Sequence, residues 1–360
     1  MRPAFSRRHI LAGAAGLAAA RAAPGWAAAG GPSHLAAARL PSEDYVLLGL
    51  DPDGDEVFRL DLPARGHAAA ARTDRPEAVA FARRPGTFAI VLDCAAGREV
   101  ARLEAPVGRH FYGHGAFTAD NALLLTTEQD YEAGEGRLGV WDVAAGYRRV
   151  AELPSGGIGP HEVVRLADGR FAVANGGILT HPATGRAKLN LSSMAPNLAF
   201  VSLAQNGPER IIEPPAELRQ NSIRHLAARG DGLVAAALQW EGSAVEAPPL
   251  LALADPAADG FTYLAAPEPE QRRANNYAGS VAFSSDGNRV AITAPRGARA
   301  FVFDVADRAL IEIIEDADIC GVASAPIGGL LFTTGTGRVR RPNLPLTHHP
   351  LAFDNHLVAL

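Results

Sequence analysis

Cysteine and lysine are both scarce in this chain of 360 residues. Its 2 cysteines are too few for a disulfide framework or a four-thiolate metal site. Lys188 is the single lysine, and no GxxxxGK[ST] sequence surrounds it, which excludes a Walker A phosphate loop. The CxxC, HExxH and GxSxG motifs are absent as well, so thiol-redox, zinc-protease and α/β-hydrolase chemistry have no support.

Basic clusters and long apolar runs are lacking too. Lys plus Arg number 34 against 39 Asp plus Glu, a net charge of −5, and such a chain is a poor nucleic-acid binder. Beyond residue 29 no apolar run approaches 18 residues, so we expect no membrane span in the mature chain. We expect a monomer.

The first 29 residues have the features of an export signal. Arg7 and Arg8 precede a short Ala/Gly/Leu-rich stretch, and an Ala-rich segment ends near Ala29. The arginine pair predicts a twin-arginine signal and therefore a periplasmic protein exported in the folded state. A Sec signal that happens to carry two arginines is the alternative.

Short strands separated by Asp- and Gly-containing turns fill the rest of the sequence, with little helical periodicity. The clearest unit, residues 277–315, contains four strands, which is typical of a propeller blade. Similar units run over 67–105, 114–153, 161–218, 222–266 and from 319 onward. The third of these carries an insertion at 179–196.

The two ends of residues 34–360 complete the predicted ring. Three strands at 34–39, 45–50 and 56–62 lack a fourth partner, which the last residues, 355–360, can supply. We therefore predict an all-β fold, a single seven-bladed β-propeller closed by a C-terminal inner strand that joins three N-terminal strands. Six or eight blades are the alternatives.

Five histidines recur near the start of the predicted innermost strands: His67, His114, His161, His225 and His356. Cys320 occupies the same point of another unit. Side chains at these points surround the central channel, so the six residues are predicted metal ligands, with Fe or Cu as the metal. The spacing from His to the next turn differs by one residue between units, and a slip of one residue reverses a strand side chain.

A structural role for these histidines is the alternative. Gly66-His67 and Gly113-His114 resemble the Gly-His pair of WD-repeat blades, in which the histidine bonds to the third strand of its own blade. The two cysteines lie on strands at different radii, so we expect two free thiols.

Other polar residues are predicted to line a ligand pocket at one end of the ring. Glu128, Asn175 and Glu241 follow second strands of their units, and Arg224 and Arg296 offer forked donors to a carboxylate or phosphate. The first three are also the only set that a Ca²⁺-dependent, lactonase-like site could use. Strand-capping turns are the structural alternative.

Several segments resemble an uncharacterised family of Tat-exported bacterial β-propellers of the YVTN/quinoprotein amine dehydrogenase-like type. The matching stretches are Tyr112–Gly115, Gly157–Glu162, Asn175–Ile178, His181-Pro182, Gly185–Leu191, Ser222–Leu226, Asn276–Val281 and Phe353–Leu357, with Phe353 where the family usually has Trp.

The resemblance implies a periplasmic propeller found beside imelysin-type, iron-regulated periplasmic proteins and di-haem peroxidase-like proteins. Our first hypothesis is a binding or docking protein linked to iron or haem acquisition, whose partner is another periplasmic iron-uptake protein. The second is a metalloenzyme, a Cu or Fe oxidoreductase with its metal at the mouth of the channel, by analogy with the propeller of nitrous-oxide reductase.

Overall fold

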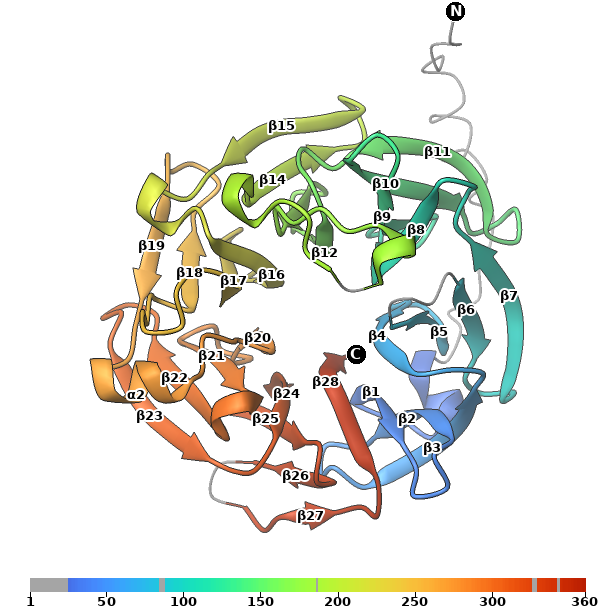
Figure 1. The fold of residues 1–360 in the computed structure, drawn as a ribbon. Helices are drawn as coiled ribbons and strands as arrows, with labels where there is room; N and C mark the ends of the chain where they lie inside the picture. The colour runs from blue at the N-terminus through green and yellow to red at the C-terminus, as the bar shows by residue number, and fades with distance from the viewer. Residues whose placement is uncertain (1–24, 84–87, 186, 326–328, 342–343) are drawn as a thin grey trace, which may run out of the picture.

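Seven four-stranded antiparallel sheets are arranged radially around a central channel in the computed structural model (Figure 1). It describes residues 25–83, 88–185, 187–325, 329–341 and 344–360. The predicted fold class is therefore confirmed. Residues 1–24 of the predicted leader lie outside the described part, and its last five residues form η2 (Gly25–Ala29), where the Trp26 indole donates a hydrogen bond to the Arg72 carbonyl at 2.8 Å.

The blades follow the predicted units closely. Blade 1 consists of β28 (Ala352–Ala359), β1 (His34–Arg39), β2 (Tyr45–Leu50) and β3 (Glu56–Leu62). Blade 2 consists of β4 (Gly66–Ala71), β5 (Glu77–Ala82), β6 (Phe88–Asp93) and β7 (Arg98–Glu104). Blade 3 consists of β8 (Arg109–Phe117), β9 (Leu123–Asp130), β10 (Glu135–Asp142) and β11 (Arg148–Pro154).

The remaining four blades complete the ring. Blade 4 consists of β12 (Pro160–Arg165), β13 (Phe171–Asn175), β14 (Asn197–Ser202) and β15 (Gly207–Ile212). Blade 5 consists of β16 (Asn221–Ala228), β17 (Val234–Trp240), β18 (Leu251–Ala254) and β19 (Phe261–Leu264). Blade 6 consists of β20 (Ser280–Phe283), β21 (Arg289–Ala294), β22 (Arg299–Asp304) and β23 (Leu310–Glu315). Blade 7 consists of β24 (Ile319–Ala325), β25 (Gly329–Thr334), β26 (Arg338–Arg340) and β27 (Thr347–His348).

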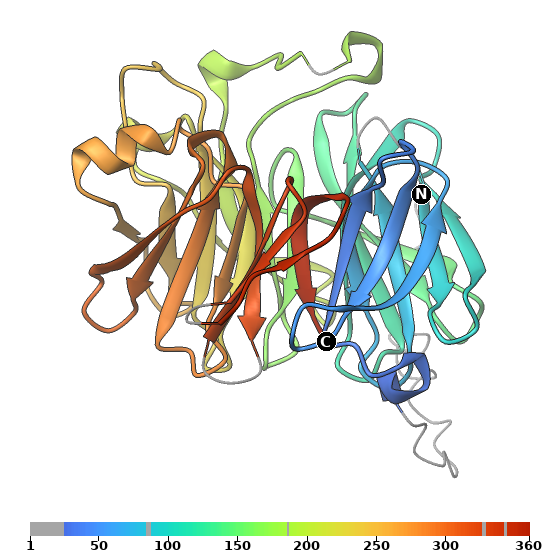
Figure 2. The same ribbon diagram turned by 90° about the horizontal axis from the view of Figure 1, so that it is seen from below.

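Helices are short and lie between strands. They are η3 (Pro182–Thr184), η4 (Leu191–Ser193), η5 (Ala216–Leu218), α2 (Glu268–Arg273) and η6 (Pro295–Gly297). The first two belong to the predicted insertion between β13 and β14, which rises over one face of the ring (Figure 2). No helix in the described residues is long and apolar enough to cross a bilayer.

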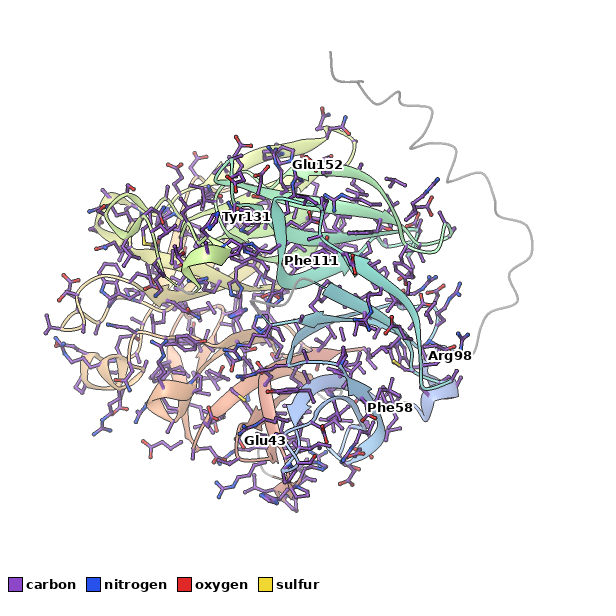
Figure 3. All side chains as sticks on the ribbon, turned by 45° about the vertical axis from the view of Figure 1, so that its right-hand side comes forward. Glu43, Phe58, Arg98, Phe111, Tyr131 and Glu152 are labelled. Carbon is purple, nitrogen blue, oxygen red and sulfur yellow. The ribbon has the colours of Figure 1, made fainter. Side chains whose placement is uncertain are left out.

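The apolar core is divided among the seven interfaces between neighbouring blades. Each of the seven buried clusters combines residues of two adjacent blades, as where Phe81 of blade 2 packs in one cluster with Phe111 and Trp141 of blade 3. Many side chains of the outer strands face solvent, and charged residues such as Arg98 and Glu152 lie on the rim of the ring (Figure 3). Burial on both faces of the inner sheets explains their continuous Val, Leu and Ala runs.

The ring is closed by antiparallel pairing of β28 with β1, in which Leu35 faces Val358 and Ala36 faces Leu357. This is the predicted closure. Leu357 and Phe353 of β28 are buried in the cluster between blades 1 and 7. Both cysteines are buried and free, as predicted, and burial raises the pKa of the Cys94 thiol to about 12.

Candidate metal centre

Five imidazoles meet on the channel axis, each delivered by the innermost strand of a different blade. They are His67 of β4, His114 of β8, His161 of β12, His225 of β16 and His356 of β28. Their ring centroids are 4.5 to 6.4 Å apart in nine of the pairs. Each side chain is buried. The five residues are called the histidine cluster below.

Irregular strand pairing aims these side chains at the axis. The register between the first two strands shifts between Gly66 and Ala69, around His67, and between Phe111 and Gly115, around His114. The shifts in blades 1, 4 and 5 likewise fall at or next to their histidines. A bulge adds a residue to one strand and redirects its side chain. The five histidine side chains therefore point in a common direction, although the spacing from His to the next turn differs between blades.

The geometry of the histidine cluster suits metal binding. His67, His114 and His161 each place one ring nitrogen within 4.8 Å of the others, and so do His114, His225 and His356. His114 belongs to both groups, so the two triads are joined. No other group of three or more His, Cys, Asp or Glu side chains in the described chain has this geometry.

Two carboxylates lie beside the rings, the partly exposed Glu162 and the buried Asp354. The Glu162 carboxylate lies between two rings, 3.5 Å from His114 Nδ1 and 3.1 Å from His225 Nδ1. The Asp354 carboxylate lies 3.8 Å from His67 Nδ1, which is too far for a hydrogen bond. Carboxylates that accept from one ring nitrogen fix the tautomer and leave the other nitrogen as the metal ligand. Glu162 thereby directs His114 Nε2 toward the cluster.

Four histidines of the cluster, His67, His161, His225 and His356, are neutral at pH 7. Burial lowers the pKa of His67 to about 3, despite the opposing effect of Asp354. Burial also lowers the pKa of His161, His225 and His356. Neutral imidazole is the form that binds a metal ion. The four rings are ready to act as ligands without losing a proton.

The two carboxylates are ionised. Burial opposes ionisation of Glu162, but His114 and His225 outweigh it and hold its pKa below the ordinary value. Burial likewise opposes ionisation of Asp354, whose pKa is nevertheless lowered by His67, Arg83 and Arg65. Two negative charges therefore stand directly behind the imidazole ligands, where they increase the basicity of the rings.

Unpartnered ring nitrogens are the strongest indication that the histidine cluster binds a ligand. Within the described chain, one buried ring nitrogen has no hydrogen-bond partner in each of four cluster residues: His67 Nδ1, His114 Nε2, His161 Nδ1 and His356 Nε2. Buried polar atoms are normally paired, and leaving one unpaired costs roughly 1–3 kcal/mol. Four such atoms within one cluster are open to coordination by a metal ion.

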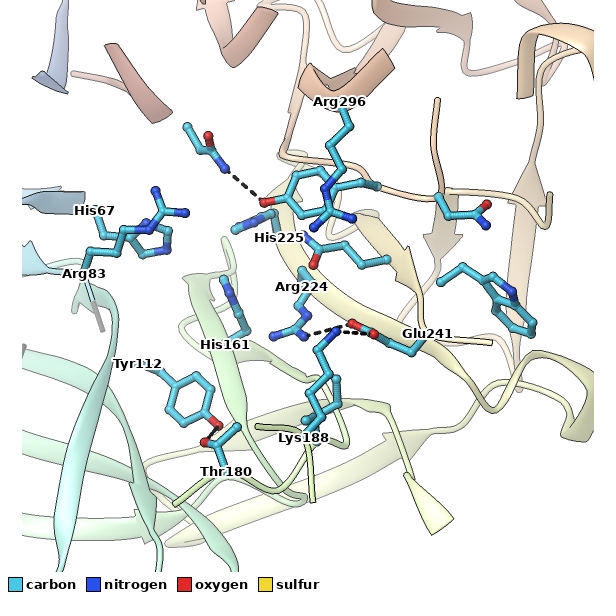
Figure 4. Close-up of a pocket in the computed structure, with 16 residues that line it drawn as sticks. His67, Arg83, Tyr112, His161, Thr180, Lys188, Arg224, His225, Glu241 and Arg296 are labelled. Atoms are coloured by element: carbon cyan, nitrogen blue, oxygen red, sulfur yellow. Dashed lines mark hydrogen bonds and ion pairs between the residues drawn. The ribbon is translucent and has the colours of Figure 1, made fainter. Parts of the chain in front are cut away.

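Two cavities meet at the histidine cluster. A cavity of about 320 Å³, called the arginine-lined pocket, opens on the face of the insertion and is lined by His67, His161 and His225 together with Arg83, Tyr112, Ile178, Thr180, Lys188, Arg224, Gln239, Trp240, Glu241, Asn276, Tyr277, Arg296 and Asn355 (Figure 4). A second cavity of about 290 Å³ is lined by His114, His225, His356 and mostly small apolar residues of the inner strands. Solutes can therefore approach the cluster.

The structure brings together some of the other predicted site residues. Arg224, Glu241 and Arg296 line the arginine-lined pocket. Glu128 and Asn175 do not: Glu128 pairs with Arg149 inside blade 3, and Asn175 bonds to Ser155. The exits of the second strands in blades 3 and 4 therefore do not share the cavity that Glu241 lines, and the set Glu128, Asn175 and Glu241 does not come together.

Cys320 is also turned away from the histidine cluster. Its Sγ donates to main-chain carbonyls, with the Asp354 oxygen 3.4 Å away. Burial raises the pKa of this thiol, which disfavours the thiolate that metals bind. The expectation that it joins the histidines as a ligand has no support from this geometry.

The structure adds residues that the sequence patterns did not single out. Glu162 and Asp354 are the carboxylates behind the rings, and Arg83 pairs with Asp354 at 3.0 Å. Glu162 follows His161 directly and Asp354 precedes His356 by two residues, so an acidic residue near a recurring histidine was an available signal. His114 contacts Glu162 of the next blade, unlike the own-blade contact of a WD-repeat histidine.

Fold and site together define a seven-bladed β-propeller with an imidazole-lined central channel. The chain belongs to the family described as "Protein of unknown function (DUF1513)", whose model matches residues 60–360. Among solved structures it is similar to hydrazine synthase of Kuenenia stuttgartiensis, with a TM-score of 0.60 and 13% identity over 92% of this chain and 99% of that chain. Identity this low shows a shared fold alone. No curated protein matches the chain.

Proposed function

We propose that the protein binds copper or iron at the histidine cluster and that this metal carries its function, a redox reaction on a small molecule. The observation that supports this most directly is the convergence of five buried imidazoles with four unpartnered ring nitrogens. A ligand set of imidazoles suits Cu, Fe, Zn and Ni rather than Mg or Ca, which prefer oxygen. Copper and iron add redox chemistry.

The residues of the chain have separate roles in this proposal. The histidines hold the metal, Glu162 orients the rings of His114 and His225, and Glu162 and Asp354 offset part of the positive charge. The arginine-lined pocket gives a substrate access to the metal from one face of the ring. The second cavity gives access from the other, more apolar face.

Elemental analysis of protein exported through its own leader tests the proposal. We expect about one or more equivalents of copper or iron per chain, and near loss of the metal in the double variant His161→Ala, His225→Ala. His348→Ala is the matched control, because His348 is exposed on β27 and lies outside the cluster. Wild-type protein that is metal-free and cannot be loaded with either ion contradicts the proposal.

The identity of the metal separates two functions. Copper supports the oxidoreductase, whereas iron that exchanges readily supports the binding or docking role in iron acquisition that the family resemblance implies. Export to the periplasm through Arg7 and Arg8 is part of both proposals. Replacing both arginines by lysine should retain the precursor in the cytoplasm, which cell fractionation measures, and unchanged export contradicts a twin-arginine leader.

A further inference from the structure

The arginine-lined pocket carries an excess of positive charge in an otherwise acidic chain. Four cationic side chains line it, Arg83, Lys188, Arg224 and Arg296, against the single carboxylate of Glu241. The chain as a whole has a net charge of −5. Charge of the opposite sign is thus concentrated beside the histidine cluster.

Each carboxylate that pairs with the cations of the pocket is shared by two cations. Glu241 is bound by Lys188 of the insertion and lies 3.7 Å from Arg224 of β16. Behind Arg83, Asp354 is shared with Arg65, at 2.6 Å from the Arg65 Nε. Cations therefore outnumber these two carboxylates in the contacts around the pocket, with two cations at each carboxylate.

Arg296 makes no ion pair with any residue that the structure describes. Its guanidinium lies 4.1 Å from the centre of the Tyr277 ring, which holds it in the pocket by a cation–π contact (Figure 4). The ring face leaves the N–H groups of the guanidinium available, and the side chain is exposed. A planar fork of this kind matches the two oxygens of a carboxylate or phosphate.

The floor and walls supply further hydrogen-bonding groups. His67, His161 and His225 form the floor, and Asn276, Asn355 and Gln239 contribute side-chain amides. The volume of about 320 Å³ suits a small molecule. An anion held by the cations of the wall would therefore lie next to the metal ligands.

We propose that the arginine-lined pocket binds a small oxyanion, a carboxylate or an inorganic oxyanion, with Arg296 as its principal free cation. The inference deepens the proposed function, since it names the substrate class of the same site. It rests on that function only for the anion's position beside a metal. The charge and shape of the pocket exist without one.

Isothermal titration calorimetry at low ionic strength tests this binding with inorganic phosphate, sulfate and succinate, and with glycerol as the neutral control. We expect at least one anion to bind and glycerol not to bind. Arg296→Gln should weaken the binding about tenfold or more, and Arg296→Lys should weaken it less. Arg148→Gln removes an exposed charge at the start of β11, away from the pocket, and should leave the affinity unchanged.

Parallel titrations of metal-free and metal-loaded protein distinguish the two proposals. Binding to metal-free protein that depends on Arg296 supports the anion site even if the histidines hold no metal. Metal binding without any anion binding overturns the inference and leaves the proposed function standing. Equal weakening by Arg296→Gln and Arg148→Gln also overturns it, because only general electrostatic attraction would then be at work. Circular dichroism of both variants verifies that they are folded.

Discussion

At the scale of single residues, the chemistry of the site comes from pairs in which one member orients the other. Glu162 serves two histidines at once and also accepts a hydrogen bond from the Leu226 N–H at 3.1 Å. Its charge is thus tied to both triads of the cluster through His114 and His225. A residue that touches no substrate can in this way decide how tightly the metal is held.

The variant Glu162→Gln tests this positioning role. Glutamine keeps the shape and an oxygen for Leu226 but removes the charge behind the two rings. We expect metal affinity to fall roughly 10- to 100-fold with little change in the thermal unfolding midpoint. Competition with a chelator of known affinity measures the first, and Glu104→Gln, an exposed change on β7, is the control. Unchanged affinity in the Glu162 variant would show that the carboxylate does not act on the metal site.

The five histidines could be identified from the sequence, but the residues that surround them could not. Recurrence at one point of the repeat identified all five members of the cluster. The same argument also selected Cys320, which lies at a register shift as the histidines do but whose Sγ faces main-chain carbonyls. Glu128 was selected as a strand-exit residue, yet Arg149 holds it inside blade 3. Orientation within a strand depends on register, which composition does not reveal.

At the scale of elements, the bulges of the inner strands set the aim of the histidines. Gly113 in β8 adopts a φ of +98°, and a Cβ at this position would lie 2.6 Å from Cδ2 of His67. The backbone of one blade thus approaches the imidazole of its neighbour more closely than any other residue would permit. This glycine links the shape of β8 to the position of a proposed ligand in β4.

Substitution of Gly113 by alanine should therefore displace His67. We expect reduced metal affinity together with destabilisation of about 1–3 kcal/mol from backbone strain and crowding. Gly108→Ala separates the two effects, because Gly108 also has a positive φ, +84°, but nothing lies within 4 Å of its Cβ position. Chemical denaturation and metal competition are measured for both variants. Equal metal affinity in the two would argue against crowding of His67.

The first and last residues of the strands were the most predictable feature of the fold. The predicted segments 34–39, 45–50 and 56–62 coincide with β1, β2 and β3, because alternating turns and apolar runs mark both ends of each strand. The insertion at 179–196 was placed correctly, but its contact through Lys188 with Glu241 was not predictable, since it depends on how a loop folds over another blade.

At the scale of the whole molecule, stability depends on an unbroken ring of interfaces. Leu357 of β28 is 6% exposed and lies in the cluster that joins blades 1 and 7. Each interface shares a blade with the next, so weakening one affects the complete array.

The variant Leu357→Ala should lower the free energy of unfolding by about 2–4 kcal/mol through the cavity it creates. Leu360→Ala, at a side chain that is 41% exposed, should change it little. Urea unfolding followed by both circular dichroism and tryptophan fluorescence measures the effect. A shift in only one of the two signals would show that the blades unfold separately rather than as a ring.

The position of β28 near the C-terminus also determines when the histidine cluster can be completed during synthesis. This strand is the last of the described strands to leave the ribosome, and it carries Asp354 and His356 as well as the pairing with β1. A nascent chain that stops short of β28 lacks the fifth imidazole and the carboxylate beside His67. If the cluster binds a metal as proposed, its complete ligand set exists only after β28 has been synthesised.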